Sequence, residues 1–199
     1  MKVIEQTATT VIIAAILMAL SGCGTKNYTP KPKAYVRISL PQKEYMIYDT
    51  AALPFTFERA GEAKVSWKQN DRRTKYFDIE YPQYRGVINL TYKHFHGKED
   101  LRTLVDTASR MLALHHSQST GEKEATLKDP QGRVYATLVR LSGKNTGSTY
   151  QFWLTDSTEH FLRGALFLNN TPNNDSLAPV INYLQADIDH MIETLQWRE

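Results

Sequence analysis

The chain has 199 residues, a formal net charge of +3 and a single cysteine. A charge this small and scattered argues against a dedicated nucleic-acid surface, so we expect no nucleic-acid partner. One cysteine cannot form an intramolecular disulfide, and packing must therefore stabilise the fold.

Residues 1–22 have the layout of a bacterial lipoprotein signal peptide. Lys2 supplies a positive start, and the apolar run Val11–Leu20 is shorter than the roughly 20 residues that span a bilayer. The letters LSGC that end at Cys23 then resemble a lipobox, in which the cysteine receives the acyl chains. We therefore predict lipidation of Cys23, with palmitate as a suitable label, and a membrane contact through that lipid.

The segment that follows, residues 23–33, predicts a flexible tether of roughly 30 Å, because its Gly, Pro and Lys content favours extended, solvated backbone. Gly24 and Thr25 stand where an aspartate would retain a lipoprotein at the inner membrane. No acidic cluster follows that would suggest export to the outer face. We therefore expect the periplasmic side of the outer membrane as the location.

Beyond the tether we expect one globular domain over residues 34–199. Period-two alternation of apolar residues predicts strands in both halves of this domain. In the first half they cover 35–39, 54–58, 77–81 and 88–92. In the second half, 133–141, 148–155 and 159–169 follow one another with short connections, which predicts a three-stranded antiparallel meander.

Apolar residues at helical spacing predict two helices, over 99–116 and 175–197. The first helix would separate the early strands from the meander, and the second would close the chain. This order predicts an α+β fold in which two main helices cover an antiparallel sheet.

The connection between the last two predicted strands carries Asp156 and Ser157, with His160 close behind. A nucleophilic serine needs a base within hydrogen-bond reach, an acid behind that base and donors for the oxyanion. Asp156 and Ser157 are neighbours whose side chains diverge, and no G-x-S-x-G elbow surrounds them. The pattern favours a hairpin turn in which Asp156 accepts backbone N–H groups. A hydrolase of envelope polymers that uses these three residues is the alternative.

His94 and His96 would project to one side of an extended strand, a spacing that suits a metal ion, but the sequence shows no third ligand near them. No glycine-rich loop with the spacing of a phosphate cradle occurs either. We therefore expect neither a metal nor another cofactor, and no catalytic residue.

Tyrosines in irregular or strand-end segments are candidate partner contacts, because large rigid rings bury area at a low entropy cost. The candidates from these segments and from the corner are Tyr35, Tyr45, Tyr48, Tyr81, Tyr84, Asp156, Ser157, His160 and Arg163. Rings of this kind also suit sugars, so a lipid- or glycan-binding lipoprotein is a further alternative.

The run QFWLTDSTEHFLRGALFLNNTPNNDSLAPVINYLQADIDHMIETLQW, at 151–197, resembles the C-terminal half of the gliding-motility lipoprotein GldD family of Bacteroidota. The letters PFTFE and DIEYPQYRGVINLTYK resemble its earlier parts, in the same order. The resemblance implies a non-enzymatic envelope protein that gliding requires, in a system tied to type IX secretion, with other envelope proteins as partners. The order of elements also resembles the Mog1/PsbP-type sandwich.

Overall fold

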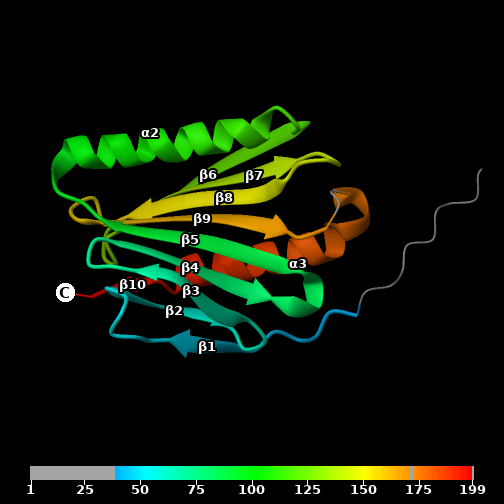
Figure 1. The fold of residues 1–199 in the computed structure, drawn as a ribbon, viewed down its shortest axis with the longest axis horizontal. Helices are drawn as coiled ribbons and strands as arrows, with labels where there is room; N and C mark the ends of the chain where they lie inside the picture. Colours follow the sequence, from blue (N-terminus) through cyan, green and yellow to red (C-terminus); the bar gives the residue numbers. More distant parts are fainter. Residues whose placement is uncertain (1–38, 171–172, 199) are drawn as a thin grey trace, which may run out of the picture. The chain divides into compact units, whose positions relative to one another are not determined.

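The computed structural model describes residues 39–170 and 173–198 (Figure 1). The predicted signal peptide, Cys23, Tyr35 and the predicted strand at 35–39, except for Ser39, lie outside these residues. In chain order the elements are β1 (Tyr45–Tyr48), β2 (Phe55–Ala60), β3 (Lys64–Asn70), β4 (Thr74–Tyr81), a 3-10 turn (Pro82–Tyr84), β5 (Gly86–His94), α2 (Gly97–His116), β6 (Gly121–Asp129), β7 (Val134–Ser142), β8 (Ser148–Thr155), β9 (His160–Leu168), α3 (Asn174–Glu193) and β10 (Gln196–Trp197).

Seven of the strands form one sheet in the order β3-β4-β5-β9-β8-β7-β6. Every neighbouring pair in it is antiparallel. After β5 the chain crosses through α2 to the far edge and returns strand by strand to β9, which pairs with β5. The β5–β9 pair therefore joins the two halves of the sequence at the centre of the sheet.

The two helices cover opposite faces of this sheet. Phe161 on β9 packs with Ala108 and its neighbours on α2, whereas the next residue, Leu162, packs in the core that includes α3. Successive strand residues point to opposite faces, so the two helices lie on different sides. A smaller sheet in the order β1-β2-β10 adds to the core on the α3 side. The predicted α+β class, with an antiparallel sheet and two helices, is confirmed.

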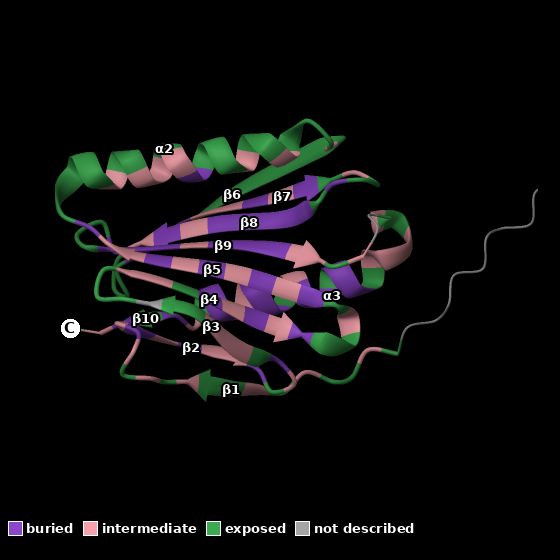
Figure 2. Ribbon diagram, in the orientation of Figure 1, coloured by how far each residue is buried: buried purple, intermediate pink, exposed green. Residues whose placement is uncertain are grey.

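Sequence alternation predicted β4 and β5, whose burial alternates, and also β8 and β9, which are mostly buried on both faces. Phe77, Ile79 and Tyr81 on β4 are each at most 2% exposed, and Ile88 and Leu90 on β5 are 1% exposed. Figure 2 shows the same concentration of buried positions on β5, β8 and β9. Alternation is a reliable signal here because at least one face of each strand meets the core.

Three strands lie outside every predicted element, and each lacks this alternation. Nearly all of β6 is exposed on both faces, so its sequence has no apolar face to recognise. A register shift between Trp67 and Gln69 interrupts β3, and β1 has only four residues. The predicted three-stranded meander is therefore the inner part of a four-stranded one.

The predicted C-terminal helix ends earlier than expected. It stops at Glu193, and Gln196–Trp197 form β10, which pairs with β2 at Thr56 and Phe55. Trp197 packs edge-on against Phe55, with ring centroids 5.3 Å apart. In the described part of the chain, no helix has the length and apolar character needed to cross a membrane.

A glycine at the centre of the sheet makes room for a core ring. Gly164 on β9 is the direct partner of Phe152 on β8, and Phe152 is fully buried. A Cβ atom built on Gly164 would lie 2.0 Å from Cζ of Phe152. The ring therefore occupies the space that any other side chain at position 164 would need.

Replacing Gly164 by alanine should destabilise the domain by about 1–3 kcal/mol or more, because an overpacked core must shift its neighbours. Denaturant unfolding of Gly164→Ala, Phe152→Ala and the double variant measures this effect. The double variant should lose less than the sum of the two single losses, by about 1–3 kcal/mol, because removing the ring also removes the clash. Strictly additive losses would contradict this account.

Candidate functional site

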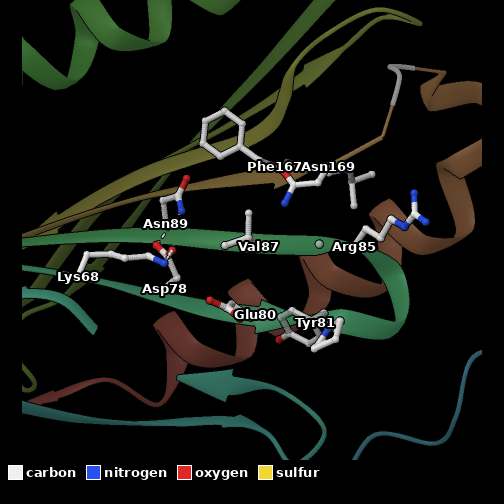
Figure 3. A pocket seen from close by; sticks show the side chains of 12 residues that line it. Lys68, Asp78, Glu80, Tyr81, Arg85, Val87, Asn89, Phe167 and Asn169 are labelled. Atoms are coloured by element: carbon white, nitrogen blue, oxygen red, sulfur yellow. Dashed lines mark hydrogen bonds and ion pairs between the residues drawn. The ribbon is translucent and has the colours of Figure 1, made fainter. Parts of the chain in front are cut away.

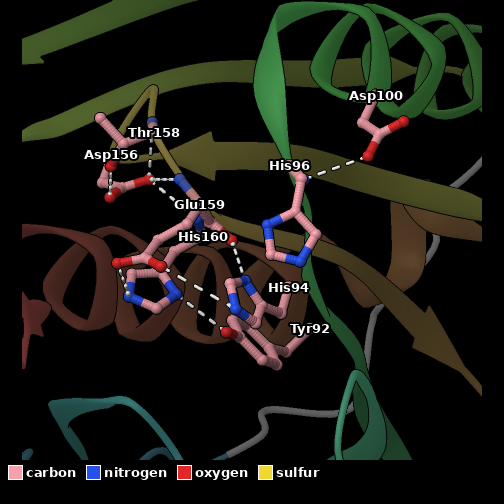
Figure 4. A network of polar contacts seen from close by, with 8 residues as sticks. All are labelled: Tyr92, His94, His96, Asp100, Asp156, Thr158, Glu159 and His160. Atoms are coloured by element: carbon pink, nitrogen blue, oxygen red, sulfur yellow. Dashed lines mark hydrogen bonds and ion pairs between the residues drawn. The ribbon is translucent and has the colours of Figure 1, made fainter.

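The connection between β8 and β9 is a tight corner that the carboxylate of Asp156 holds together (Figure 4). Its Oδ1 accepts the backbone N–H groups of Thr158 at 3.0 Å, Glu159 at 3.0 Å and His160 at 2.8 Å. Its Oδ2 accepts the hydroxyl of Thr158. Burial alone would raise the pKa of Asp156, but these hydrogen bonds outweigh burial and lower the pKa. Asp156 is therefore an ionised structural group.

Ser157 stands at the tip of the corner, exposed and with a left-handed φ of 68°. Its own N–H donates to the hydroxyl of Thr155 at 3.0 Å. A catalytic triad would need Asp156 to bind the imidazole of His160, but Asp156 binds the backbone N–H of that residue instead. The predicted turn is thus present, and the geometry of a nucleophilic serine is lacking among the described contacts.

His160 begins β9 with its imidazole largely buried. Its Nδ1 lies 2.8 Å from the hydroxyl of Tyr92, and its ring stacks on Trp197 with centroids 5.0 Å apart. Burial lowers the pKa of His160 despite the charges of Asp156 and Glu159, so the ring is neutral at pH 7. Burial raises the pKa of Tyr92, which keeps its proton.

A cavity of about 500 Å³ opens beside this corner. The end of β5, the corner, the loop before β2, the β3–β4 hairpin and the C-terminus converge on it. The lining residues are Ala51, Ala52, Leu53, Pro54, Arg72, Lys75, Tyr92, His94, Glu159, His160 and Arg198. This volume lies in the range of small-ligand sites, and the cavity combines an apolar wall with titratable groups. We name it the corner cavity.

A second groove, of about 640 Å³, lies over β3, β4, β5 and β9 (Figure 3). Its polar groups already bind one another: Asp78 accepts a hydrogen bond from Asn89 at 2.7 Å and pairs with Lys68 at 3.5 Å. The corner cavity is therefore the stronger candidate site, because its lining includes the imidazole of His160, whose pKa is lowered by burial.

Several of the predicted partner contacts are not accessible. Tyr81 is 2% exposed, so its ring belongs to the core and offers a partner almost no surface. The side chains of Asp156 and His160 are also buried, at 2% and 8% exposure, which leaves them little surface to offer. Ser157 is exposed at the corner tip. The sequence alone could not distinguish the buried positions from the exposed one, because all of them lie at or next to the end of a strand.

The remaining candidates are half-buried and engaged within the domain. The hydroxyl of Tyr45 donates to Asp187 at 2.9 Å, and Arg163 donates to Gln151 at 2.8 Å. Tyr48 and Tyr84 pack on other core-side rings. Their contact role stays a prediction.

Asp187 is a buried residue that sequence analysis missed. Its Oδ1 lies 2.6 Å from Nζ of Lys43, and only 2% of its side chain is exposed. Position 187 lies between the buried residues Leu184 and Ile188 on α3. The sequence did hold a signal for this buried position, because Asp187 is an acidic residue inside the apolar stripe of the predicted helix. This pair ties the segment before β1 to α3.

Comparisons with known proteins place the chain. A family model described as "Gliding motility lipoprotein GldD" matches residues 25–197. No curated protein matches the chain. Among solved structures, the chain is similar to the solution structure of cyanobacterial PsbP (CyanoP) from Synechocystis sp. PCC 6803, with 8% identity and a TM-score of 0.46. That match covers 81% of this chain and 97% of that chain.

Replacing Asp156 by asparagine should cost about 2–3 kcal/mol of unfolding free energy at pH 7, because an ionised acceptor of several hydrogen bonds is lost. The folded-state pKa of Asp156 is lowered, so its contribution is present above about pH 4 and disappears as the pH falls through the folded pKa. Denaturant unfolding of both proteins at pH 7 and near pH 2 should show the difference shrinking in acid.

Ser157→Ala is the matched control at the neighbouring position, and its stability should stay within about 0.5 kcal/mol of the wild type. An equal loss in both variants, or an Asp156→Asn deficit that persists unchanged in acid, would contradict the assigned role of the carboxylate.

Proposed function

Because the chain belongs to the gliding motility lipoprotein GldD family, we propose that it is a non-enzymatic component of the gliding and type IX secretion machinery. A lipid on Cys23 would hold it at the periplasmic face of the outer membrane. The observation that carries this proposal is the family match over residues 25–197, which begins two residues after the lipobox cysteine. The three-residue hydrolase hypothesis gains no support from the corner, where Asp156 and His160 bind other groups.

A lipid carrier would need space between the sheet and α3. The described residues there are tightly packed: Phe152, Leu154, Leu184 and Ile188 are each 0% exposed. This packing favours a role in protein contact over one in carrying an acyl chain between these layers.

The proposed contact surface is β1, the edge of the small sheet. Ile47 and Met46 are 70% and 48% exposed there, while Tyr45 turns its hydroxyl inward to Asp187. This strand follows the tether closely in sequence, so a lipid on Cys23 would raise its effective concentration toward a protein in the same membrane. Exposed aliphatic side chains on an edge strand suit an apolar surface of such a partner. Ser157 at the corner tip is a proposed second contact.

Cys23→Ser should abolish labelling by palmitate and release the chain from the membrane fraction, because each buried methylene contributes about 0.8 kcal/mol to anchoring. Colony spreading or secretion should fall to the level of a deletion strain. Full motility of a strain that carries only the unlabelled protein would contradict the proposed anchor.

Ile47→Asp should reduce motility or secretion while changing stability by no more than about 0.5 kcal/mol, because the side chain is 70% exposed. Leu114→Asp on α2 is the matched control, since Leu114 is 76% exposed on another element. In vivo crosslinking from each position, followed by mass spectrometry, measures contact directly. A motility loss that is equal for both variants would count against β1 as the specific surface.

A further inference from the structure

Three side chains lie close together at the mouth of the corner cavity. His94 on β5 and His160 on β9 are direct cross-strand partners, so their side chains project from the same face of the sheet. Their ring centroids are 6.0 Å apart. The carboxylate of Glu159 lies between them, with Oε2 at 3.8 Å from Nε2 of His94 and Oε1 at 3.9 Å from Nε2 of His160 (Figure 4). Both distances exceed those of hydrogen bonds.

The protonation of His94 follows from its other nitrogen. Nδ1 of His94 lies 3.0 Å from the backbone carbonyl oxygen of Glu159. A carbonyl oxygen only accepts, so Nδ1 is the donor of this hydrogen bond, and Nε2 is the nitrogen that offers a lone pair when it binds a metal ion. That lone pair faces the Glu159 carboxylate. Two acceptors that face each other repel, and a cation between them removes the repulsion.

His160 can present its Nε2 in the same way. The hydroxyl of Tyr92 lies 2.8 Å from Nδ1 and can accept a hydrogen bond from the Nδ1–H group. In that tautomer the lone pair is on Nε2. In metal sites, a ligating histidine usually makes a hydrogen bond through the ring nitrogen that does not bind the metal. Both imidazoles of this cluster have a partner for such a hydrogen bond.

We propose that His94, His160 and Glu159 bind a divalent transition-metal ion of the Zn²⁺ type. Zinc–nitrogen bonds of about 2.0–2.1 Å in a tetrahedral site put two imidazole centroids roughly 5.2 Å apart. The observed 6.0 Å is longer than that value, and His94 lies outside the group of ligand atoms that are all within 4.8 Å of one another. The proposal therefore requires His94 to move toward His160 on binding, and the side chains of His94 and Glu159 are 30% and 54% exposed, which leaves both room to adjust. Two histidines and one carboxylate leave a fourth position open toward the cavity.

Three neighbours of the cluster have other roles. Asp156 has a carboxylate oxygen within 4.8 Å of ligand atoms on Glu159 and His160, but backbone N–H groups and the Thr158 hydroxyl already occupy that carboxylate. Arg72 and Arg198 line the same cavity. Their charge favours an anionic group as the fourth ligand of the bound ion. Two of the three proposed ligands, Glu159 and His160, thus come from the opposite half of the sequence, and His96 is not among the ligands.

The test uses the full mature chain in detergent, purified without a polyhistidine tag and stripped with a chelator. Zinc titration by calorimetry should give one ion per chain, and zinc should raise the Tm. His94→Ala and Glu159→Gln change partly exposed residues and should weaken the zinc Kd at least tenfold. Tyr92→Phe should weaken it 10- to 100-fold, because only the group that orients His160 is lost. Cobalt in place of zinc should give visible absorption bands that the His94→Ala variant lacks.

His116→Ala is the matched control. His116 pairs with Glu122 at 2.8 Å, closer than either pair in the cluster, but on an exposed surface. This variant should keep the wild-type zinc Kd. A Kd unchanged in His94→Ala and Glu159→Gln would overturn the proposal, as would loss of zinc in His116→Ala. A Tm that rises with inorganic phosphate and not with zinc would also overturn it, and would identify an anion site.

Discussion

Asp156 accepts three backbone N–H groups and a hydroxyl within a single corner, which fixes the course of the chain from β8 into β9. Because the first residue of β9 is thereby placed, His160 comes to lie opposite His94 and beneath the side chain of Glu159. The ring stack of His160 on Trp197 follows from the same placement. A buried carboxylate that is fully hydrogen-bonded can serve as such a fixed point, since its donors compensate the loss of water.

The residues that resemble a catalytic set are therefore explained by their hydrogen bonds. Asp156 shapes the corner, Ser157 supplies its left-handed tip, and His160 binds Tyr92. The same corner nevertheless leaves the Glu159 carboxylate 3.8 Å from Nε2 of His94 and 3.9 Å from Nε2 of His160 at the cavity mouth. Structural and ligand-binding roles can coexist here because they use different atoms: the backbone of residues 158–160 for the turn, and the side chains of Glu159 and His160 for the cavity.

Sequence periodicity predicted those parts of the fold in which at least one face is buried in the core. The strands around Phe77 and Ile88 and the stripe of α3 were found because burial alternates along them. β6 was missed because water reaches both of its faces. Trp197 extended the helical stripe in sequence, but its ring meets Phe55 from a strand. The pairing of His94 with His160 could not be foreseen, because it depends on the register of β5 against β9, which local patterns do not encode.

The ion pair between Lys43 and Asp187 has a mechanical consequence. Nζ of Lys43 also donates to the carbonyl of Tyr183 at 2.7 Å, so the segment before β1 is fastened to α3 at two points. When a domain is pulled by its N-terminus, tension reaches this fastening before it reaches the hydrogen bonds between β1 and β2. Separating a buried charge from its partner costs about 3–5 kcal/mol. These contacts therefore take up a force applied at the N-terminus before it reaches β1. The apolar surface of β1 then keeps its shape while the chain is pulled.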